Sequence, residues 1–267
     1  MNVIMNHLLF EELPSLNAIS DLRNQYLNKL LEAQELYLEL FIRNSKVFVI
    51  KSQGRQIGYY LLGTDATLLE YFVISEYIDH SDEILGEILG RFSIRKALCK
   101  SFDHTFLSCC IGFQKKVNVL GIHFREKRDK DARPSDEGLT VRLATTDDEQ
   151  HIIEINEAVF EHDEEVREYI QSGKIFLFEK KKNIVGFGIF SRVIEGRPEF
   201  DIGVLVETKF RRQGYGEYIV RYLADYCSQN GWRAICGCAI ENTGSRKCLE
   251  NAGFIAQYRL LEFVFHS

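Results

Sequence analysis

Residues 211–216 combine two arginines and two glycines in an order that suits phosphate binding. They read Arg-Arg-Gln-Gly-Tyr-Gly and lie between an apolar run at 200–206 and a helical pattern that ends at Asn230-Gly231. Gly214 and Gly216 lack side chains, so a ligand can approach the backbone N–H groups closely. The first N–H groups of a helix have no internal partner, and the helix dipole adds positive potential there. The loop therefore predicts an anion site, to which Arg211 and Arg212 add fixed positive charge.

Strand and helix patterns around this loop predict how it is positioned. From residue 139 we expect a short strand, two helices, a hairpin at 174–193, the strand before the loop and the helix after it. A strand at 233–240, a short helix ending at Gly253-Phe254 and a strand at 258–265 complete the set. The order β-α-α-β-β-β-α-β-α-β predicts an α/β (α+β mixed sheet) fold with helices on both faces.

Two motifs in this half resemble the GNAT acetyltransferase superfamily. Arg-x-x-Gly-x-Gly after an apolar strand resembles the family's loop for the pyrophosphate of acetyl-CoA. Asn242, Ser245 and Gly253-Phe254 resemble its closing helix, although Leu249 stands where the family has Tyr. The resemblance covers residues 139–267 and implies the GNAT-like acyl-CoA N-acyltransferase fold, with acetyl-CoA as the acyl donor and co-substrate.

The resemblance also implies which residues contact coenzyme A. In the family the strand before the loop splays, and its backbone groups hold the pantetheine and the acyl carbonyl. Gly203 is where we expect the splay or a bulge, because glycine weakens strand pairing. The residues implied to bind the cofactor are Leu205, Val206, Arg211, Arg212, Gln213, Gly214, Tyr215, Gly216, Asn242 and Ser245.

Acyl transfer from a thioester requires a neutral amine, N–H donors for the oxyanion and a route for the leaving thiolate. The family often places a carboxylate base on the strand before the loop. Phe200 occupies the usual position, so Glu199 and Asp201, which flank it, are the candidate bases, and a surface charge at the strand end is the alternative for Asp201. Glu161, His162 and Asp163 lie between the two helices where the family binds acceptors; a solvated loop is the alternative there.

The general acid departs from the family pattern, since Leu249 cannot donate a proton. Cys248 and Tyr258 are nearby alternatives. A thiol has a pKa of about 8.5, so the thiolate of coenzyme A leaves readily. A general acid contributes about 10²–10⁴-fold, so its absence slows the reaction without forbidding it.

Composition limits the other classes of function. The chain has 267 residues, a net charge of -6 and 45% hydrophobic residues. This charge argues against nucleic-acid binding through bulk positive charge. No apolar run approaches the length that spans a membrane, and the start of the chain lacks the basic region of a signal peptide. The seven cysteines are odd in number and lack paired zinc spacing, so we expect a cytoplasmic protein with reduced thiols and no metal.

The first half of the chain aligns with the second. KVFVI at 46 faces KIFLF at 174, and Ile57-Gly58-Tyr59 faces Val185-Gly186-Phe187, both at an offset of 128. The strand 68–74 is followed by an acidic segment without arginine, so phosphate would be repelled there. Nine charged residues fill 126–138 and predict a linker. We therefore expect a degenerate GNAT-like domain at 1–125, a linker at 126–138 and a GNAT acetyltransferase domain at 139–267.

Together these features favour an acetyl-CoA-dependent N-acetyltransferase whose acceptor is a small amine, acting as a monomer or homodimer without nucleic acid or membrane. The missing Tyr and the uncertain base favour one alternative, a non-catalytic acyl-CoA-binding or regulatory protein. A peptidyl or aminoacyl transferase on the same pair of folds would need no coenzyme A, and Arg211 and Gly214 argue against it.

Overall fold

The structure is a computed structural model that describes residues 8–130, 138–157 and 159–265. The described residues form two compact units. Unit 1 comprises the chain up to Ile122 together with the residues from Tyr258 onward, and unit 2 comprises His123–Gln257.

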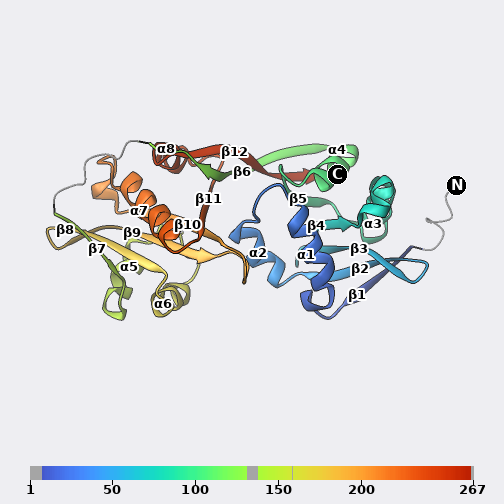
Figure 1. Ribbon diagram of the computed structural model, residues 1–267, viewed down its shortest axis with the longest axis horizontal. Coiled ribbons are helices and arrows are strands. Elements are labelled where there is room, and N and C mark those ends of the chain that lie inside the picture. The colour runs from blue at the N-terminus through green and yellow to red at the C-terminus, as the bar shows by residue number, and fades with distance from the viewer. Residues whose placement is uncertain (1–7, 131–137, 158, 266–267) are drawn as a thin grey trace. The chain divides into compact units, whose positions relative to one another are not determined.

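The elements of unit 2 follow the order predicted from the sequence (Figure 1). They are β7 (Leu139–Leu143), α5 (Glu149–Ile155), α6 (Asp163–Gln171), β8 (Ile175–Lys180), β9 (Asn183–Arg192), β10 (Glu199–Val206), α7 (Tyr215–Gln229), β11 (Arg233–Ala239), α8 (Thr243–Asn251) and the start of β12 (Phe254–Val264). A 3-10 turn, η5 (Thr208–Phe210), joins β10 to the glycine loop.

Unit 1 repeats this order of elements. They are β1 (Leu8–Leu13), α1 (Ser20–Lys29), α2 (Leu36–Arg43), β2 (Lys46–Ser52), β3 (Arg55–Leu62), β4 (Leu68–Val73), α3 (Ser81–Phe92), β5 (Lys96–Lys100), α4 (His104–Phe113) and β6 (Lys116–Lys127). The sequence prediction omitted β1, which pairs antiparallel with β2 from Leu8↔Ser52 to Leu13↔Val47. The tandem α/β fold is therefore confirmed.

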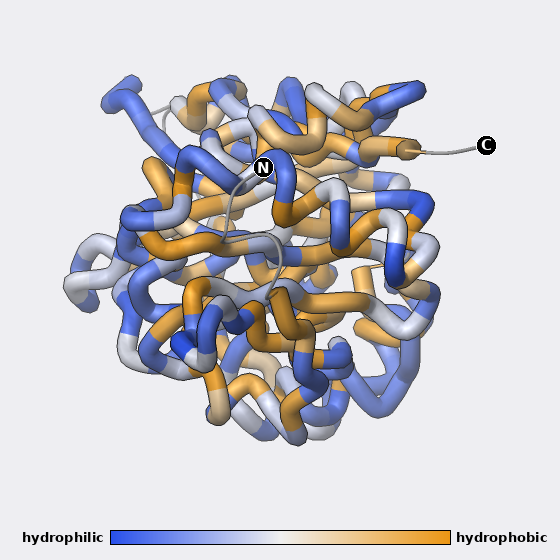
Figure 2. The backbone as a smooth tube through the Cα atoms, turned by 90° about the vertical axis from the view of Figure 1, so that its right-hand side faces the viewer, coloured by the Kyte–Doolittle hydropathy of each residue, from blue (hydrophilic) through white to orange (hydrophobic). Residues whose placement is uncertain are grey.

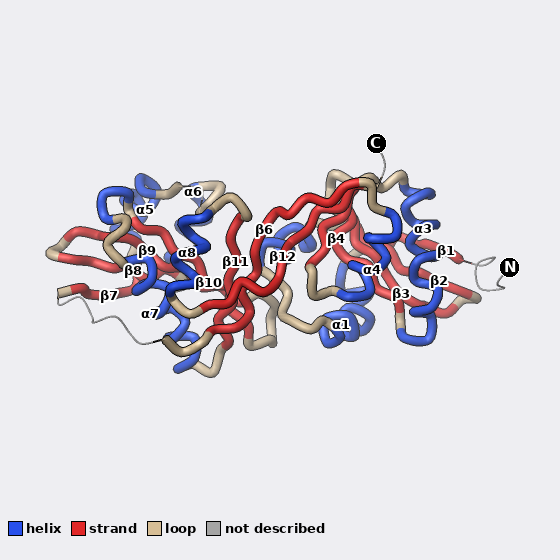
Figure 3. Tube along the Cα trace, turned by 90° about the horizontal axis from the view of Figure 1, so that it is seen from above, coloured by secondary structure: helices blue, strands red, loops and turns tan. Residues whose placement is uncertain are grey.

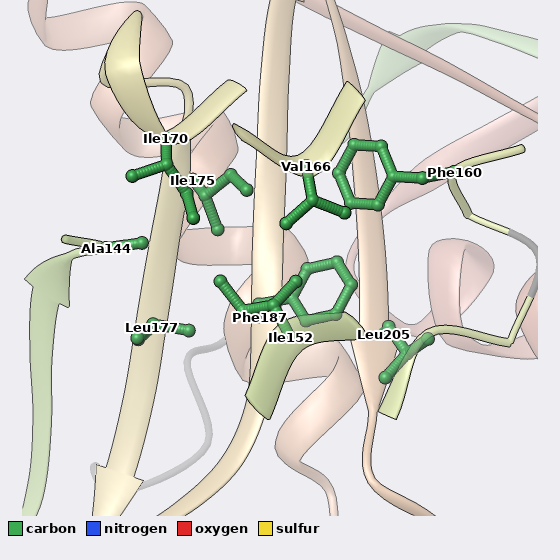
Figure 4. Packing of buried hydrophobic residues seen from close by; sticks show 9 residues of the cluster. All are labelled: Ala144, Ile152, Phe160, Val166, Ile170, Ile175, Leu177, Phe187 and Leu205. Atoms are coloured by element: carbon green, nitrogen blue, oxygen red, sulfur yellow. The ribbon is translucent and has the colours of Figure 1, made fainter. Parts of the chain in front are cut away.

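Helices cover both faces of the unit 2 sheet. On one face Ile152 of α5 and Val166 and Ile170 of α6 pack against Phe187 of β9 and Leu205 of β10 (Figure 4). On the other face, a Cβ built on Gly188 would lie 2.8 Å from Leu223 Cδ1 of α7, so glycine permits the close approach of this helix. Burial on both faces explains the continuous apolar run in β10. Along the backbone in Figure 2, hydrophobic stretches, orange, alternate with hydrophilic ones, blue.

The two units exchange strand segments. The strand order is β1-β2-β3-β4-β5-β12-β6 in unit 1 and β12-β6-β11-β10-β9-β8-β7 in unit 2, so β6 and β12 contribute to both. They run side by side (Figure 3), joined by Lys115 N to Val264 O at 2.8 Å in unit 1 and by Arg128 N to Gly253 O at 2.9 Å in unit 2. Leu260 to Val264 also pair with β5.

These strand segments change the ends of the predicted domains. Residues from Tyr258 onward, predicted for the C-terminal domain, lie in unit 1, and His123 to Arg125, predicted for the N-terminal domain, lie in unit 2. Of the predicted linker 126–138, Glu126 and Lys127 belong to β6, and residues 131–137 lie outside the described residues. The charge of this segment concealed the end of β6, because its last two residues leave too little pattern to predict a strand.

Removal of the segment His123–Lys127 should destabilise unit 2. The fragment 139–267 lacks the strand beside β11, including the buried Arg125, whose Nη1 donates to Cys236 O at 3.1 Å. It would expose an unpaired sheet edge, which promotes aggregation. We expect 139–267 to aggregate or to melt well below the fragment 116–267, which keeps β6, in thermal unfolding followed by circular dichroism. Equal solubility and equal melting temperatures would contradict this role of the segment.

The start of α5 should make unit 2 sensitive to acid. Arg142 donates two hydrogen bonds of 2.7 Å to the carboxylate of Asp148, which also accepts from Thr145 N at 2.8 Å. The Arg142 hydrogen bonds, opposed by burial, lower the pKa of Asp148 to about 2. Because the folded pKa lies below the unfolded value, the stabilisation is complete above about pH 4 and is lost as the pH falls toward 2.

We therefore expect Asp148→Asn to lower the free energy of unfolding by about 1–2 kcal/mol at pH 7, after allowance for the exposure of Arg142. The difference from the unaltered protein should shrink between pH 4 and pH 2, measured by urea unfolding. Glu149→Gln, which breaks an exposed pair with Arg167, is the control and should have a smaller effect. A loss for Asp148→Asn that does not depend on pH would show that charge pairing is not the cause.

Candidate active site

β10 leaves its parallel neighbour β11 halfway along its length. The two strands pair at Glu199↔Arg233, Phe200↔Ala234 and Asp201↔Ile235, and within these fully described strands the pairing ends there. β10 continues on its other side with β9 as far as Val206↔Gly186. The edge of β10 toward β11 is therefore open from Ile202 onward.

Two hydrogen bonds show which backbone groups face this open edge. Val193 N donates to Glu199 O at 3.1 Å and Glu207 N donates to Val185 O at 3.0 Å, so odd-numbered residues of β10 bond to β9. Backbone groups alternate in direction along an antiparallel strand, so Val204 and Val206 direct theirs toward the open edge. Val206 thus lies where the sequence placed it, whereas Leu205 directs its carbonyl at β9 and its side chain into the apolar cluster. Val204 was not predicted from the sequence. It lies two residues before Val206, and alternate residues of a strand direct their backbone groups to the same edge.

Gly203 does not form a bulge. Its register with β9 is continuous from Phe200↔Arg192 to Val206↔Gly186, so the bulge expected at Gly203 is absent and the splay lies only on the β11 side. A Cβ at Gly203 would lie 2.8 Å from Ile189 Cγ1. Glycine therefore leaves room for Ile189 on the face of the sheet that carries α5 and α6.

The loop after β10 contains two residues in left-handed conformations. Arg212 has φ +60° and Gly214 has φ +92°, and α7 begins at the next residue, Tyr215. Arg212 pays about 1–2 kcal/mol for this conformation, and strain of this kind clusters at ligand sites. Turns that alternate in this way direct successive N–H groups into a concavity that suits anions. Arg212 and Gln213 are exposed at this place, as an anion site requires.

Gly216 faces the space between the end of β10 and α8. A Cβ built there would lie 2.8 Å from Cys248 Sγ and 3.6 Å from Val206 Cγ2. Asn242 caps this helix, because its side-chain oxygen accepts from Ser245 N at 2.9 Å. Val206, Gly216 and α8 therefore meet at one place in unit 2, and Asn242 and Ser245 lie at the start of α8. Leu205 instead faces the apolar cluster.

The candidate bases lie at the point where the strands part. Asp201 is half-buried in the last pair with β11 and faces Ser191 of β9, whose buried hydroxyl has no hydrogen-bond partner in the structure. Burial first, and then the charge of Asp201, raise the pKa of the Cys236 thiol. Side chains of odd-numbered residues lie on the face of Leu205, so Asp201 and Glu199 share the side of the sheet that α5 and α6 cover.

The predicted acceptor residues also lie on this side. Glu161, His162 and Asp163 are exposed at the start of α6, and Glu161 N donates to Glu165 Oε2 at 3.0 Å. α6 packs through Val166 on the cluster that contains Leu205. The structure therefore places α6, with these residues at its start, on the same side of the sheet as Asp201.

The candidates for the general acid differ in position. Leu249 is buried, and Cys248 next to it faces Gly216. Burial first, and then Glu217, raise the pKa of Cys248 to about 11, so it is a thiol at neutral pH. Tyr258 belongs to unit 1, where its ring packs edge-on to Phe102 at 5.4 Å between ring centroids.

Unit 1 has the same framework, and its β4 pairs with the parallel neighbour β5 only at Leu68↔Ala97. Gly58↔Val73 matches Gly186↔Val206, and Leu61↔Glu70 matches Ile189↔Gly203, so Glu70 stands where unit 2 has Gly203. The buried Glu70 accepts hydrogen bonds from Arg23, Tyr59 and Gln34, which closes this place with polar side chains.

The segment before α3 is a 3-10 helix, Ser75–His80, and none of its residues has a positive φ. It carries Glu76, and Asp82 and Glu83 follow in the first turn of α3. It therefore lacks both the shape and the charge of an anion site.

Two broad classes of site are absent from the described ranges. None of the helices in residues 8–130, 138–157 and 159–265 is long and apolar enough to cross a membrane. Over the same residues, no three His, Cys, Asp or Glu side chains gather so that they could hold a metal ion.

Sequence comparison matches each half of the chain to one family. The profile of an acetyltransferase (GNAT) domain matches residues 15–127, and that of the acetyltransferase (GNAT) family matches residues 142–254. No curated protein sequence matches the chain.

Solved structures have the same fold over the whole chain. An acetyltransferase from the GNAT family of Colwellia psychrerythraea is 18% identical with a TM-score of 0.87, covering 97% of this chain and 100% of its own. A GCN5-related N-acetyltransferase from Sphaerobacter thermophilus is 14% identical with a TM-score of 0.65, covering 97% and 96%. A tandem GNAT protein from the clavulanic acid biosynthesis pathway is 11% identical with a TM-score of 0.57, covering 96% and 97%. Since both halves match its profiles and the whole chain has its fold, the protein belongs to the GNAT acetyltransferase family, with two GNAT domains in tandem.

Proposed function

We propose that unit 2 is an acetyl-CoA-dependent N-acetyltransferase that acetylates a small amine. The observation that carries this proposal is the open edge of β10, which leads directly into the loop with left-handed Arg212 and Gly214 at the start of α7. A strand edge with free N–H and C=O groups suits a molecule with amides, and the loop suits its phosphates. Coenzyme A carries both groups in one molecule.

The residues of unit 2 then have separate tasks. The N–H groups of the loop hold the pyrophosphate, while Val204 and Val206 offer backbone groups to the pantetheine amides and the acyl carbonyl. Asp201, with Glu199 beside it, accepts the proton that the amine must lose in forming the amide. The acetyl group passes to the amine nitrogen as the carbon–sulfur bond breaks, and the thiolate of coenzyme A leaves. Cys248 is the protonated side chain that faces the space beside Val206.

Coenzyme A should bind once per chain, and Gly216→Val should weaken this binding strongly. A side chain at Gly216 fills the space between Val206 and Cys248, and the loss of one or two charge-assisted hydrogen bonds weakens binding by about 10–100-fold. Isothermal titration calorimetry measures both affinity and stoichiometry. Cys248→Ala, introduced together with Gly216→Val, makes room for the valine side chain. A loss of binding in this double variant then reflects the loop and not a loss of folding.

Gly90→Ala, in a helix of unit 1 with open space around it, is the control and should bind as the unaltered protein does. Arg211→Glu together with Arg212→Glu should also abolish binding, by reversing the charge of the loop. Two sites per chain, or an unchanged affinity in the Gly216 variant, would contradict the assignment of the loop.

Transfer itself should be visible as thiol release from acetyl-CoA with a panel of small amines. Asp201→Asn keeps the size of the side chain and removes the base, so the rate should fall by about 10²–10⁴-fold while coenzyme A still binds. Glu199→Gln tests the neighbouring carboxylate in the same assay. Tight binding of coenzyme A without release by any amine would favour the alternative of a non-catalytic acyl-CoA-binding protein, for which the buried Leu249 in place of Tyr is the supporting observation.

A further inference from the structure

One carboxylate ties the anion-binding loop to the segment between α5 and α6. Thr208 Oγ1 donates to Glu157 Oε1 at 2.8 Å, and Arg211 Nη2 donates to Glu157 Oε2. Thr208 opens the turn η5 and Arg211 follows it, so Glu157 holds both ends of the turn that leads from β10 to the glycine loop. Hydrogen bonds from Arg211 and Thr208 lower the pKa of Glu157, which is therefore ionised at neutral pH.

Arg211 also reaches the open edge of β10. Its Nε donates to Val206 O at 2.9 Å, so its guanidinium lies between a backbone carbonyl of the donor site and Glu157. This arginine therefore joins three parts of unit 2: the strand end, the loop and the segment that leads into α6.

The segment that carries Glu157 is anchored at its other end. Asn156 Oδ1 accepts from Val159 N at 2.9 Å and from Phe160 N at 3.2 Å, and Asn156 Nδ2 donates to Phe160 O at 2.9 Å. Phe160 is buried in the apolar cluster, with its ring 6.1 Å from that of Phe187 between centroids. The residue next to Glu157 thus holds backbone groups of Val159 and Phe160. The candidate acceptor residues Glu161, His162 and Asp163 follow directly.

We propose that Glu157 is a positioning residue that couples the donor loop to the acceptor side of the site, so that binding of coenzyme A orders residues 159–163. This inference rests on the proposed function of unit 2. Coenzyme A restricts the loop and the turn η5, and the bonds of Glu157 transmit the restriction to the turn at Asn156. A ligand that stiffens one element in this way alters a second site without a large displacement.

The exposure of the pair suits such a link. The side chains of Arg211 and Glu157 are 43% and 51% exposed, so their attraction is screened and adds little to overall stability. The same unit offers a matched pair, Arg167 with Glu149, which are 52% and 21% exposed and join α6 to α5 without contact to the loop. A comparison of the two pairs separates coupling from the general effect of losing an ion pair.

Hydrogen exchange on the full chain, with and without coenzyme A, tests the coupling without need of the acceptor. In the unaltered protein we expect coenzyme A to slow exchange in 211–217 and, by at least about threefold, at 159–163. Glu157→Gln keeps the size of the side chain but turns one acceptor oxygen into a donor that faces Arg211. It should keep the protection at 211–217 and lose the response at 159–163. Glu149→Gln should behave as the unaltered protein.

Thr208 provides a second test of the same link. Thr208→Val removes one of the two bonds and should weaken the response at 159–163, whereas Thr208→Ser keeps the hydroxyl and should preserve it. No response at 159–163 in the unaltered protein, faster exchange there, or an unchanged response in Glu157→Gln would overturn the coupling. Absence of protection at 211–217 in the unaltered protein would instead contradict the proposed binding of coenzyme A.

Discussion

The open edge of β10 is the constraint on which the rest of unit 2 depends. A strand that leaves its neighbour keeps N–H and C=O groups unpaired, and a buried unpaired group costs about 1–3 kcal/mol. The strand stays in place because its register with β9 is continuous and because apolar helices cover both of its faces. Arg211 Nε donates to Val206 O, a carbonyl of this edge. The glycine loop follows the end of this strand through the turn η5.

The two units show how one framework supports a site or closes it. Gly58 and Gly186 occupy the same place, and a Cβ at either would lie within 2.3 Å of a carbonyl of the next strand, Phe72 O or Leu205 O. Two residues before these carbonyls on the same strand, unit 2 has Gly203 and unit 1 has Glu70. Buried charges must be paired, and Arg23 lies 3.0 Å from Glu70 and 2.6 Å from Glu39. Burial alone would raise the pKa of Glu70, but Arg23, together with Lys100 and Tyr59, lowers it. Unit 1 thus holds a charge network where unit 2 has Gly203, near the start of its open edge.

The sequence predicted the elements better than the ends of the units. Periodicity and turn residues were sufficient for the order of strands and helices in unit 2 and for the tandem fold, because these signals are local. The loop was predictable because Gly214 and Gly216 lie between an apolar strand and a helix start, where glycine has a definite use. The direction of Leu205 was not, because register depends on the partner strand. Glu157 gave no signal at all: its role comes from Arg211 and Thr208, more than fifty residues away along the chain.

Unit 1 keeps its fold although it lacks the features of an anion site, and the strands β6 and β12, which contribute to both units, explain this. Unit 2 needs His123–Lys127 beside β11, and this segment is the end of a strand that starts in unit 1. Unit 1 in turn needs Leu260–Val264, which pair with β5 and form the end of the last strand of unit 2. A change that closes the site of unit 1, such as a carboxylate at Glu70, leaves both strands intact. A change that unfolds unit 1 removes the start of β6 and so disturbs the sheet of unit 2. Each unit therefore depends on a strand segment that continues from the other unit's part of the chain.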